Sequence, residues 1–224
     1  MLSEVTFSFL KALSENNNTK WMHLHIDLYR QEKDNFIMLL KKVIARMAEV
    51  DPVYKDLDVK KTLYRQNKDI RFTRDKRPYK KHFGARISPD GKNGDFAGMY
   101  IHVEKDRSYL AVGMRQPAAV VWKKVREYMA AHYKELESIL EDKTVRKTFG
   151  KPHGERTNRL LKKYADHPAR KLLKYKSLYF YHDIPNKVVI AQNFDAYIFN
   201  EWLIMKPFID FLNDGAESFP IFDK

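Results

Sequence analysis

The chain has 224 residues, of which 44% are hydrophobic and 13% aromatic, so it can fill a core and is not expected to be disordered. It contains no cysteine, which excludes disulfides, cysteine-ligated zinc and a cysteine nucleophile. The formal net charge of +13 is concentrated in two segments: residues 60–92 carry 12 basic and 3 acidic side chains, and residues 143–176 carry 12 and 2. Such an asymmetry concerns partners and solubility rather than the fold.

The amino-terminal quarter predicts helices. Ser3 is suited to cap a first helix that runs to about Glu15, where "NNN" ends it because Asn tolerates the left-handed backbone of a helix stop. Thr19 is a plausible cap for the next segment. From Phe36 onward an apolar stripe at helical spacing predicts an amphipathic helix that closes at "DP", residues 51–52. The members of the stripe are Phe36, Leu40, Val43 and Met47.

The first 18 residues have no basic region ahead of an apolar core and no small-residue cleavage site, so we do not expect a signal peptide. The longest apolar runs, such as "FIMLL", are too short to cross a bilayer. We therefore expect a cytoplasmic soluble protein without a membrane partner. The sequence leaves its oligomeric state open.

After residue 52 the period of the pattern changes to two, which predicts strands. The segment "LYRQNKDIRF", residues 63–72, would place Arg65, Asn67, Asp69 and Arg71 on one face of a strand. "GMYIHVE" and "SYLAVGM" predict two further strands joined across "KDR" as a hairpin. Tyr100, His102 and Glu104 are expected to share one face of the first of these, opposite Met99, Ile101 and Val103.

The carboxyl-terminal half predicts a helix that begins at Pro117, followed by a basic region of helices and turns through Lys176. A half-buried strand is expected at "KSLYFYH", and the last helix is expected over 194–212, bent at Pro207. The stripe of the first helix would be about six turns long and consists of Val121, Val125, Tyr128, His132, Leu136 and Ile139. Together these elements predict an α+β fold: a single domain over 1–224, with a central antiparallel sheet flanked by N-terminal, central and C-terminal helices.

The stretch "DIRFTRDKRPYKKHFGA", residues 69–85, closely resembles the signature of the domain of unknown function 2461 family. "FLKALSENNNTKW", "MYIHVEK", "DHPARKLLKYKSL" and "KPFIDFLN" follow the order of that family, so the resemblance covers nearly the whole chain. Two pieces depart from the family pattern: "MHLHIDLY" after Trp21, and "RLLKKYA" where the family carries a Pro-Gly segment. The resemblance implies a single α+β domain, and it brings no activity, substrate or catalytic residue.

The common nucleotide and hydrolase motifs are absent from the sequence. It has no GxxxxGK[ST] and no GxSxG, and the glycines of "GKNGDFAG" have the wrong spacing for a dinucleotide turn. The eight histidines do not form HExxH or a comparable ligand spacing, so structural or solvent roles are favoured over metal binding, and no cofactor is expected. His132, which lies on an apolar stripe, is interpreted as a partly buried core residue.

One constellation of residues points to a site for an anion. Arginine forks bind carboxylate or phosphate in a bidentate manner, and a neighbouring aspartate can hold one fork in place. If the hairpin pairs beside the strand over 63–72, a histidine and a glutamate join that face. The candidate residues are Arg65, Asp69, Arg71, Arg74, Lys76, Arg77, Tyr79, Lys80, Lys81, His102 and Glu104.

Three functions remain open at this point. The first is binding of an anionic partner, a phosphate-bearing ligand or a nucleic acid, through the motif around residues 65–86. The second is an enzyme for a phosphorylated or carboxylated small molecule, with Arg65 and Arg71 as a clamp and His102 or Glu104 as acid and base. The third is a scaffold for another protein. A purely structural alternative is an internal salt-bridge network with an exposed basic turn, in which the interleaved aromatics, such as Phe72, anchor the motif in the core instead of stacking on bases.

Overall fold

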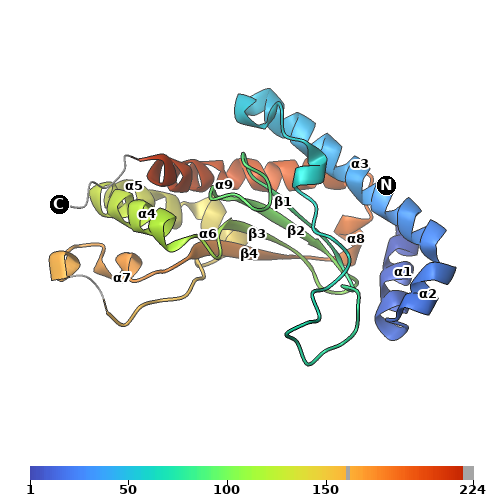
Figure 1. The fold of residues 1–224 in the computed structure, drawn as a ribbon. Helices are drawn as coiled ribbons and strands as arrows, with labels where there is room; N and C mark the ends of the chain where they lie inside the picture. The colour runs from blue at the N-terminus through green and yellow to red at the C-terminus, as the bar shows by residue number, and fades with distance from the viewer. Residues whose placement is uncertain (160–161, 219–224) are drawn as a thin grey trace. The chain divides into compact units, whose positions relative to one another are not determined.

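The computed structural model describes residues 1–159 and 162–218 (Figure 1). The chain forms two compact units. Unit 1 consists of Met1–Lys92, Tyr100–Leu110 and Asp183–Asn200, and unit 2 consists of Asn93–Met99, Ala111–His182 and the residues from Glu201 onward.

The helices of unit 1 lie mostly in its first 61 residues. They are α1 (Glu4–Glu15), α2 (Thr19–Leu24), α3 (Ile26–Val50), the 3-10 helices η1 (Pro52–Tyr54) and η2 (Val59–Lys61), and α8 (Asn186–Val189). Ser3 caps α1 in a capping box with Thr6, as its place before the apolar residues predicts. Two expectations were wrong in detail. Asn16 ends α1 at φ −119° and not in the left-handed region, and the side chain that caps α2 is that of Asn18, not Thr19.

The core of unit 1 forms between α3 and the first strand. The predicted stripe of α3 is buried, and the Phe36 ring lies 5.6 Å from the ring of Phe83 on β1. α3 ends at Asp51 as predicted, and the Asp51 side chain then accepts a hydrogen bond from the backbone N–H of Val53, which starts η1. This packing fixes the start of β1, where the candidate site lies.

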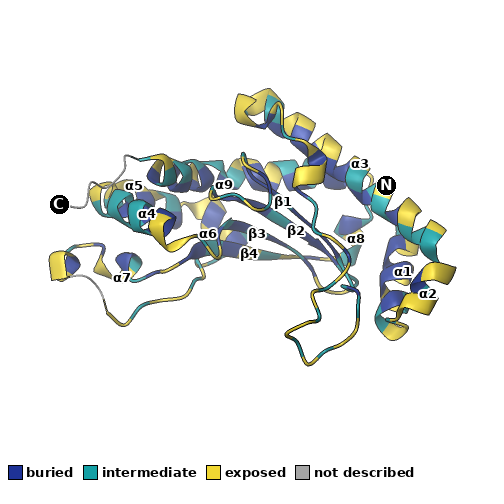
Figure 2. Ribbon diagram, in the orientation of Figure 1, coloured by how far each residue is buried: buried dark blue, intermediate teal, exposed yellow. Residues whose placement is uncertain are grey.

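The sheet has four antiparallel strands in the order β1-β2-β3-β4. They are β1 (Phe83–Ile87), β2 (Gly98–Val103), β3 (Ser108–Met114) and β4 (Leu178–Ile184). The predicted hairpin is β2 and β3, and Asp106 at φ 63° lies in its turn. Met99, Ile101 and Val103 of β2 are fully buried, and Figure 2 shows this burial along the strands.

The continuous strand predicted over residues 63–72 does not form. Residues 62–68 do pair with 78–86 through the isolated bridges Leu63↔Ala85 and Asn67↔Tyr79 and through further backbone hydrogen bonds between the two segments, and residues 69–77 form the loop that joins them. The side chains of Asp69 and Asp75 each accept a hydrogen bond from the backbone N–H two residues on, at Arg71 and Arg77. These aspartate turns compete with a strand, and they explain why the antiparallel pairing stops at residue 68 and does not continue to residue 72.

The helices of unit 2 are α4 (Ala119–Ala131), α5 (Tyr133–Glu141), α6 (Lys143–Phe149), η3 (Lys162–Tyr164) and α7 (Arg170–Leu173), and α9 (Phe194–Glu217) contributes to both units. The predicted six-turn helix is interrupted at His132, whose backbone lies at φ −113° and ψ 29°. His132 is exposed and stacks on Tyr128, so its assignment to the core was wrong. Of the predicted stripe, Val121, Val125 and Leu136 are buried, and Leu140 is buried instead of Ile139.

The α+β class with an antiparallel sheet is confirmed. β4 covers the strand predicted at "KSLYFYH", and α9 passes through Pro207 and ends five residues beyond the predicted Leu212. That the chain forms one domain stays a prediction. Within the described ranges, none of the helices combines the length and apolarity that a membrane crossing requires.

Candidate functional site

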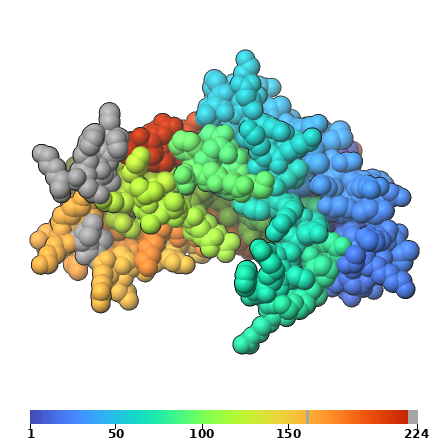
Figure 3. Space-filling model, in the orientation of Figure 1, coloured from blue at the N-terminus to red at the C-terminus, as the bar shows by residue number. Residues whose placement is uncertain are grey.

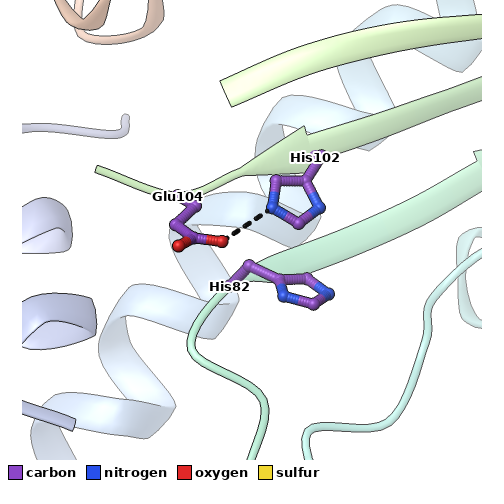
Figure 4. A group of neighbouring side chains, drawn as sticks. All are labelled: His82, His102 and Glu104. Atoms are coloured by element: carbon purple, nitrogen blue, oxygen red, sulfur yellow. Dashed lines mark hydrogen bonds and ion pairs between the residues drawn. The ribbon is translucent and has the colours of Figure 1, made fainter. Parts of the chain in front are cut away.

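The candidate site lies where β1 begins and β2 ends, within unit 1. Lys81 and His82 directly precede β1, His102 is the penultimate residue of β2, and Glu104 directly follows that strand. Because β1 and β2 are neighbours in the sheet, the two imidazoles face each other, with ring centroids 4.0 Å apart. Figure 4 shows His82, His102 and Glu104 gathered at this edge.

The side chain of His102 is held by two neighbouring rings and two hydrogen bonds. Its side chain is only 8% exposed and lies between the ring of His82 and the ring of Tyr109 on β3, 4.5 Å away and nearly parallel. Its Nδ1 lies 3.3 Å from the Tyr100 hydroxyl, and its Nε2 lies 3.0 Å from Oε2 of Glu104. Tyr100, His102 and Glu104 share the face that the alternation of β2 predicts.

Glu104 bridges a lysine and a histidine. Lys81 Nζ lies 2.8 Å from Oε1, while His102 binds the other carboxylate oxygen, Oε2. Burial raises the pKa of Glu104, but the hydrogen bonds from Lys81 and His102 outweigh this effect and leave the pKa below its usual value. The carboxylate is therefore ionised at neutral pH.

Both histidines are neutral. Burial, the nearby His102 ring and the ammonium groups of Lys80 and Lys81 lower the pKa of His82 to about 3, although Glu104 acts in the opposite direction. Burial also lowers the pKa of His102, against the raising effect of Glu104. Because an ionised carboxylate only accepts, the single proton of His102 lies on Nε2, and Nδ1 accepts from the Tyr100 hydroxyl.

The His82 ring differs from that of His102 in its hydrogen bonding. Over residues 1–159 and 162–218, no hydrogen bond or ion pair engages a ring nitrogen of His82. The donor atoms of His82, His102 and Glu104 all lie within 4.8 Å of one another, which makes these three residues a possible set of metal ligands.

A second feature of unit 1 is the basic loop, residues 68–78, whose charges are largely paired with each other. Arg71 binds Asp69 at 2.7 Å, and Asp75 binds both Lys68 at 2.9 Å and Arg77 at 2.8 Å. The hydrogen bonds from Arg77 and then from Lys68 hold the pKa of Asp75 well below its usual range. The loop is thus ordered by its own ion pairs.

Phe72 lies in the middle of the basic loop and is 93% exposed. The guanidinium of Arg71 lies 5.5 Å from the centre of its ring. Tyr79 and Phe83, the two aromatics that follow, are buried, so the core interpretation holds for them and not for Phe72. Figure 3 shows this teal to green part of the chain projecting into solvent.

The family of conserved hypothetical proteins DUF2461 matches residues 5–211. The chain belongs to this family. No curated protein and no solved structure matches it. The description of DUF2461 names no activity, so the function of this member is argued from the geometry of its own residues.

The structure divides the predicted site residues of this DUF2461 chain into two groups. Lys81, His102 and Glu104 come together at the strand ends. The basic loop holds Asp69, Arg71, Arg74, Lys76 and Arg77, and Lys76 donates to the backbone carbonyl of Ile70.

Three predicted residues belong to neither group. Arg65 is exposed, and the Lys80 ammonium lies over the ring of Tyr64, 5.2 Å from its centre. Tyr79 is buried, and its backbone exchanges two hydrogen bonds with the Asn17 side chain. Sequence reasoning missed His82, although the residue stands inside the "KKHFGA" of the family motif.

Proposed function

We propose that this DUF2461 protein binds single-stranded nucleic acid through the basic loop. The observation that carries the proposal is the 93% exposure of Phe72 between cationic neighbours. Single strands are bound without sequence preference by aromatic rings that stack on bases and by cations that track the phosphates. An exposed aromatic ring has a large apolar area that a stacked base would cover.

The ion pairs of the basic loop support this function, since they order the loop without neutralising it. Asp75 is shared by Lys68 and Arg77, so that group keeps a net positive charge. In the part of the chain that the structure describes, Arg74 forms no ion pair, and Lys76 contacts only a backbone carbonyl. Both side chains are exposed, and they are the ones we expect to contact phosphates.

The test is fluorescence anisotropy of a labelled single strand and of a duplex across a salt series. Removing Arg74 and Lys76 together as Arg74→Gln and Lys76→Gln should reduce the slope of log K against log salt by about 1.4 for the single strand. Phe72→Ala should weaken single-strand binding by about 5- to 150-fold, because stacking is worth about 1–3 kcal/mol per base, and should affect the duplex less.

The controls change the same chemistry elsewhere in unit 1. Lys41→Gln with Lys42→Gln removes two exposed cations from α3, and Leu24→Ala removes an apolar side chain that is 75% exposed. We expect neither control to change the affinity as the loop variants do. Absence of binding at low salt, or equal effects of loop and control variants, would refute the proposal.

A second candidate function is an enzyme that acts on a phosphorylated or carboxylated small molecule. The hydrogen bond between His102 and Glu104 favours it, since it joins an acid and a base beside the Lys81 ammonium. The clamp would have to be Lys81, because Arg71 is engaged by Asp69. In a screen of phosphoesters and carboxylates, His102→Gln should lose turnover at a temperature at which unfolding measurements show the variant still folded. A screen in which the wild type processes no substrate refutes this second function.

A further inference from the structure

We propose that His82, His102 and Glu104 form a binding site for a divalent transition-metal ion of the zinc class. Two imidazoles and one carboxylate are a ligand set that such ions use when a fourth position stays open for water or another ligand. The inference goes beyond nucleic-acid binding and does not depend on it. His102 lies in β2, His82 directly precedes the adjacent β1 and Glu104 directly follows β2, so two paired strands hold the site more precisely than a loop would.

The distances are close to those that an ion would impose. With bonds of about 2.1 Å in a tetrahedral site, neighbouring donor atoms stand about 3.4 Å apart. His102 Nε2 and Glu104 Oε2 are already 3.0 Å apart, and no two donor atoms of the cluster lie more than 4.8 Å from each other. No hydrogen bond or ion pair with the described residues restrains the ring nitrogens of His82, so this ring can turn to bring its donor atom closer to the other two.

An ion at this site would take the place of the proton between His102 and Glu104. The proton would leave Nε2 of His102 while Nδ1 gains one, so the ring stays neutral and Nε2 can ligate. Nδ1 would then donate to the Tyr100 hydroxyl, which lies 3.3 Å away and can accept as well as donate. A ligating histidine with its second nitrogen held in this way is the usual arrangement around protein-bound metals.

Lys81 acts against the ion and tunes its affinity. The Lys81 ammonium lies 2.8 Å from Oε1 of Glu104, so Oε2 remains for the metal. The positive charge repels a cation at this distance, so Lys81→Met should tighten metal binding by about tenfold. If the cluster is only a salt-bridge network, the same change would remove a structural contact and would not produce a tighter metal site.

The experiment is calorimetric titration of Zn²⁺ into full-length protein stripped with a chelator. We expect one ion per chain in the wild type. His82→Gln and Glu104→Gln should each weaken binding by about tenfold or more, and Tyr100→Phe by about 10- to 100-fold. His23→Gln, which changes an exposed histidine on α2, is the matched control and should bind like the wild type.

Two further measurements keep the result interpretable. The visible spectrum of the Co²⁺-loaded wild type should show the intense bands of a four-coordinate ion. This result does not depend on whether any of the variants folds. His82→Gln should leave single-strand binding unchanged, which separates this inference from the proposed function. No Zn²⁺ binding by the wild type, equal binding by the wild type and the ligand variants, or weaker binding by Lys81→Met would overturn the proposal.

Discussion

Gly113→Ala tests how closely β3 and β4 approach within unit 2. Gly113 has a φ of +126°, which costs a residue with a Cβ about 1–2 kcal/mol. A Cβ there would also stand 2.4 Å from the carbonyl oxygen of Leu178 and 2.9 Å from Cα of Tyr179, both on β4. Relieving such overpacking costs about 1–3 kcal/mol. We expect the free energy of unfolding to fall by about 2–5 kcal/mol in total. This is a large fraction of the unfolding free energy of a typical protein, which is about 5–15 kcal/mol.

The assay is equilibrium unfolding in denaturant, with Gly150→Ala as the matched control. Gly150 also has a positive φ, of +72°, but a Cβ there would meet nothing within 4 Å. This control should therefore lose only about 1 kcal/mol from the backbone conformation. Equal losses in the two variants, or a Gly113→Ala protein as stable as the wild type, would refute the close approach of the strands.

Two other predictions concern unit 1. Thr6→Val should destabilise the protein by about 1–3 kcal/mol in the same unfolding assay, because the buried Glu32 carboxylate loses a hydrogen bond of 2.5 Å. Thr6→Ser keeps the hydroxyl and should retain most of the stability of the wild type. Asp75 should titrate below about 3.9 by carbon NMR, so its ion pairs persist above that pH and are lost as the pH falls through the lowered pKa. Arg77→Gln should raise the titration midpoint of Asp75, and an unchanged midpoint would argue against the ion pair between the two residues.

The face of β2 could be predicted because the signals for it are local. Alternation across "GMYIHVE" places Tyr100, His102 and Glu104 on one side, and the short "KDR" connection fixes the hairpin to β3. The end of α3 was equally readable from the apolar stripe and the terminal "DP", but the stripe from Phe36 did not predict the start of the helix at Ile26. In these segments backbone preference, side-chain pattern and turn residues all agree.

The position of His82 could not be predicted, since it depends on pairing between β1 and β2 across the intervening residues. A search for ligands at fixed local spacing, as in HExxH, does not detect residues contributed by two strands. The alternation over 63–72 does not give a continuous strand, for a different reason. Asp69 and the second loop aspartate use their side chains to form turns, and this local hydrogen bonding overrides the pattern of the letters.

The sequence left two roles open for the charge of the motif, an internal ion-pair network and an anion-binding surface. The ion pairs of Asp69 and of Asp75 are the internal network that the structural alternative describes. The exposure of Phe72 could not be deduced, because an aromatic in an alternating segment fits a core as well as a surface. Only the three-dimensional path of the basic loop distinguishes the two.

The central claim is that a base stacks on residue 72, and a tryptophan placed there tests it most directly. Phe72→Trp adds an exposed indole to a chain with three tryptophans, and its emission can be compared with the wild type during titration with an oligothymidylate. Val120→Trp, at a position on α4 that is 66% exposed, is the control. Stacking on bases quenches indole emission, so we predict saturable quenching at position 72 that weakens with salt, and none at position 120. Equal emission changes at the two positions, or none at position 72, would contradict the account.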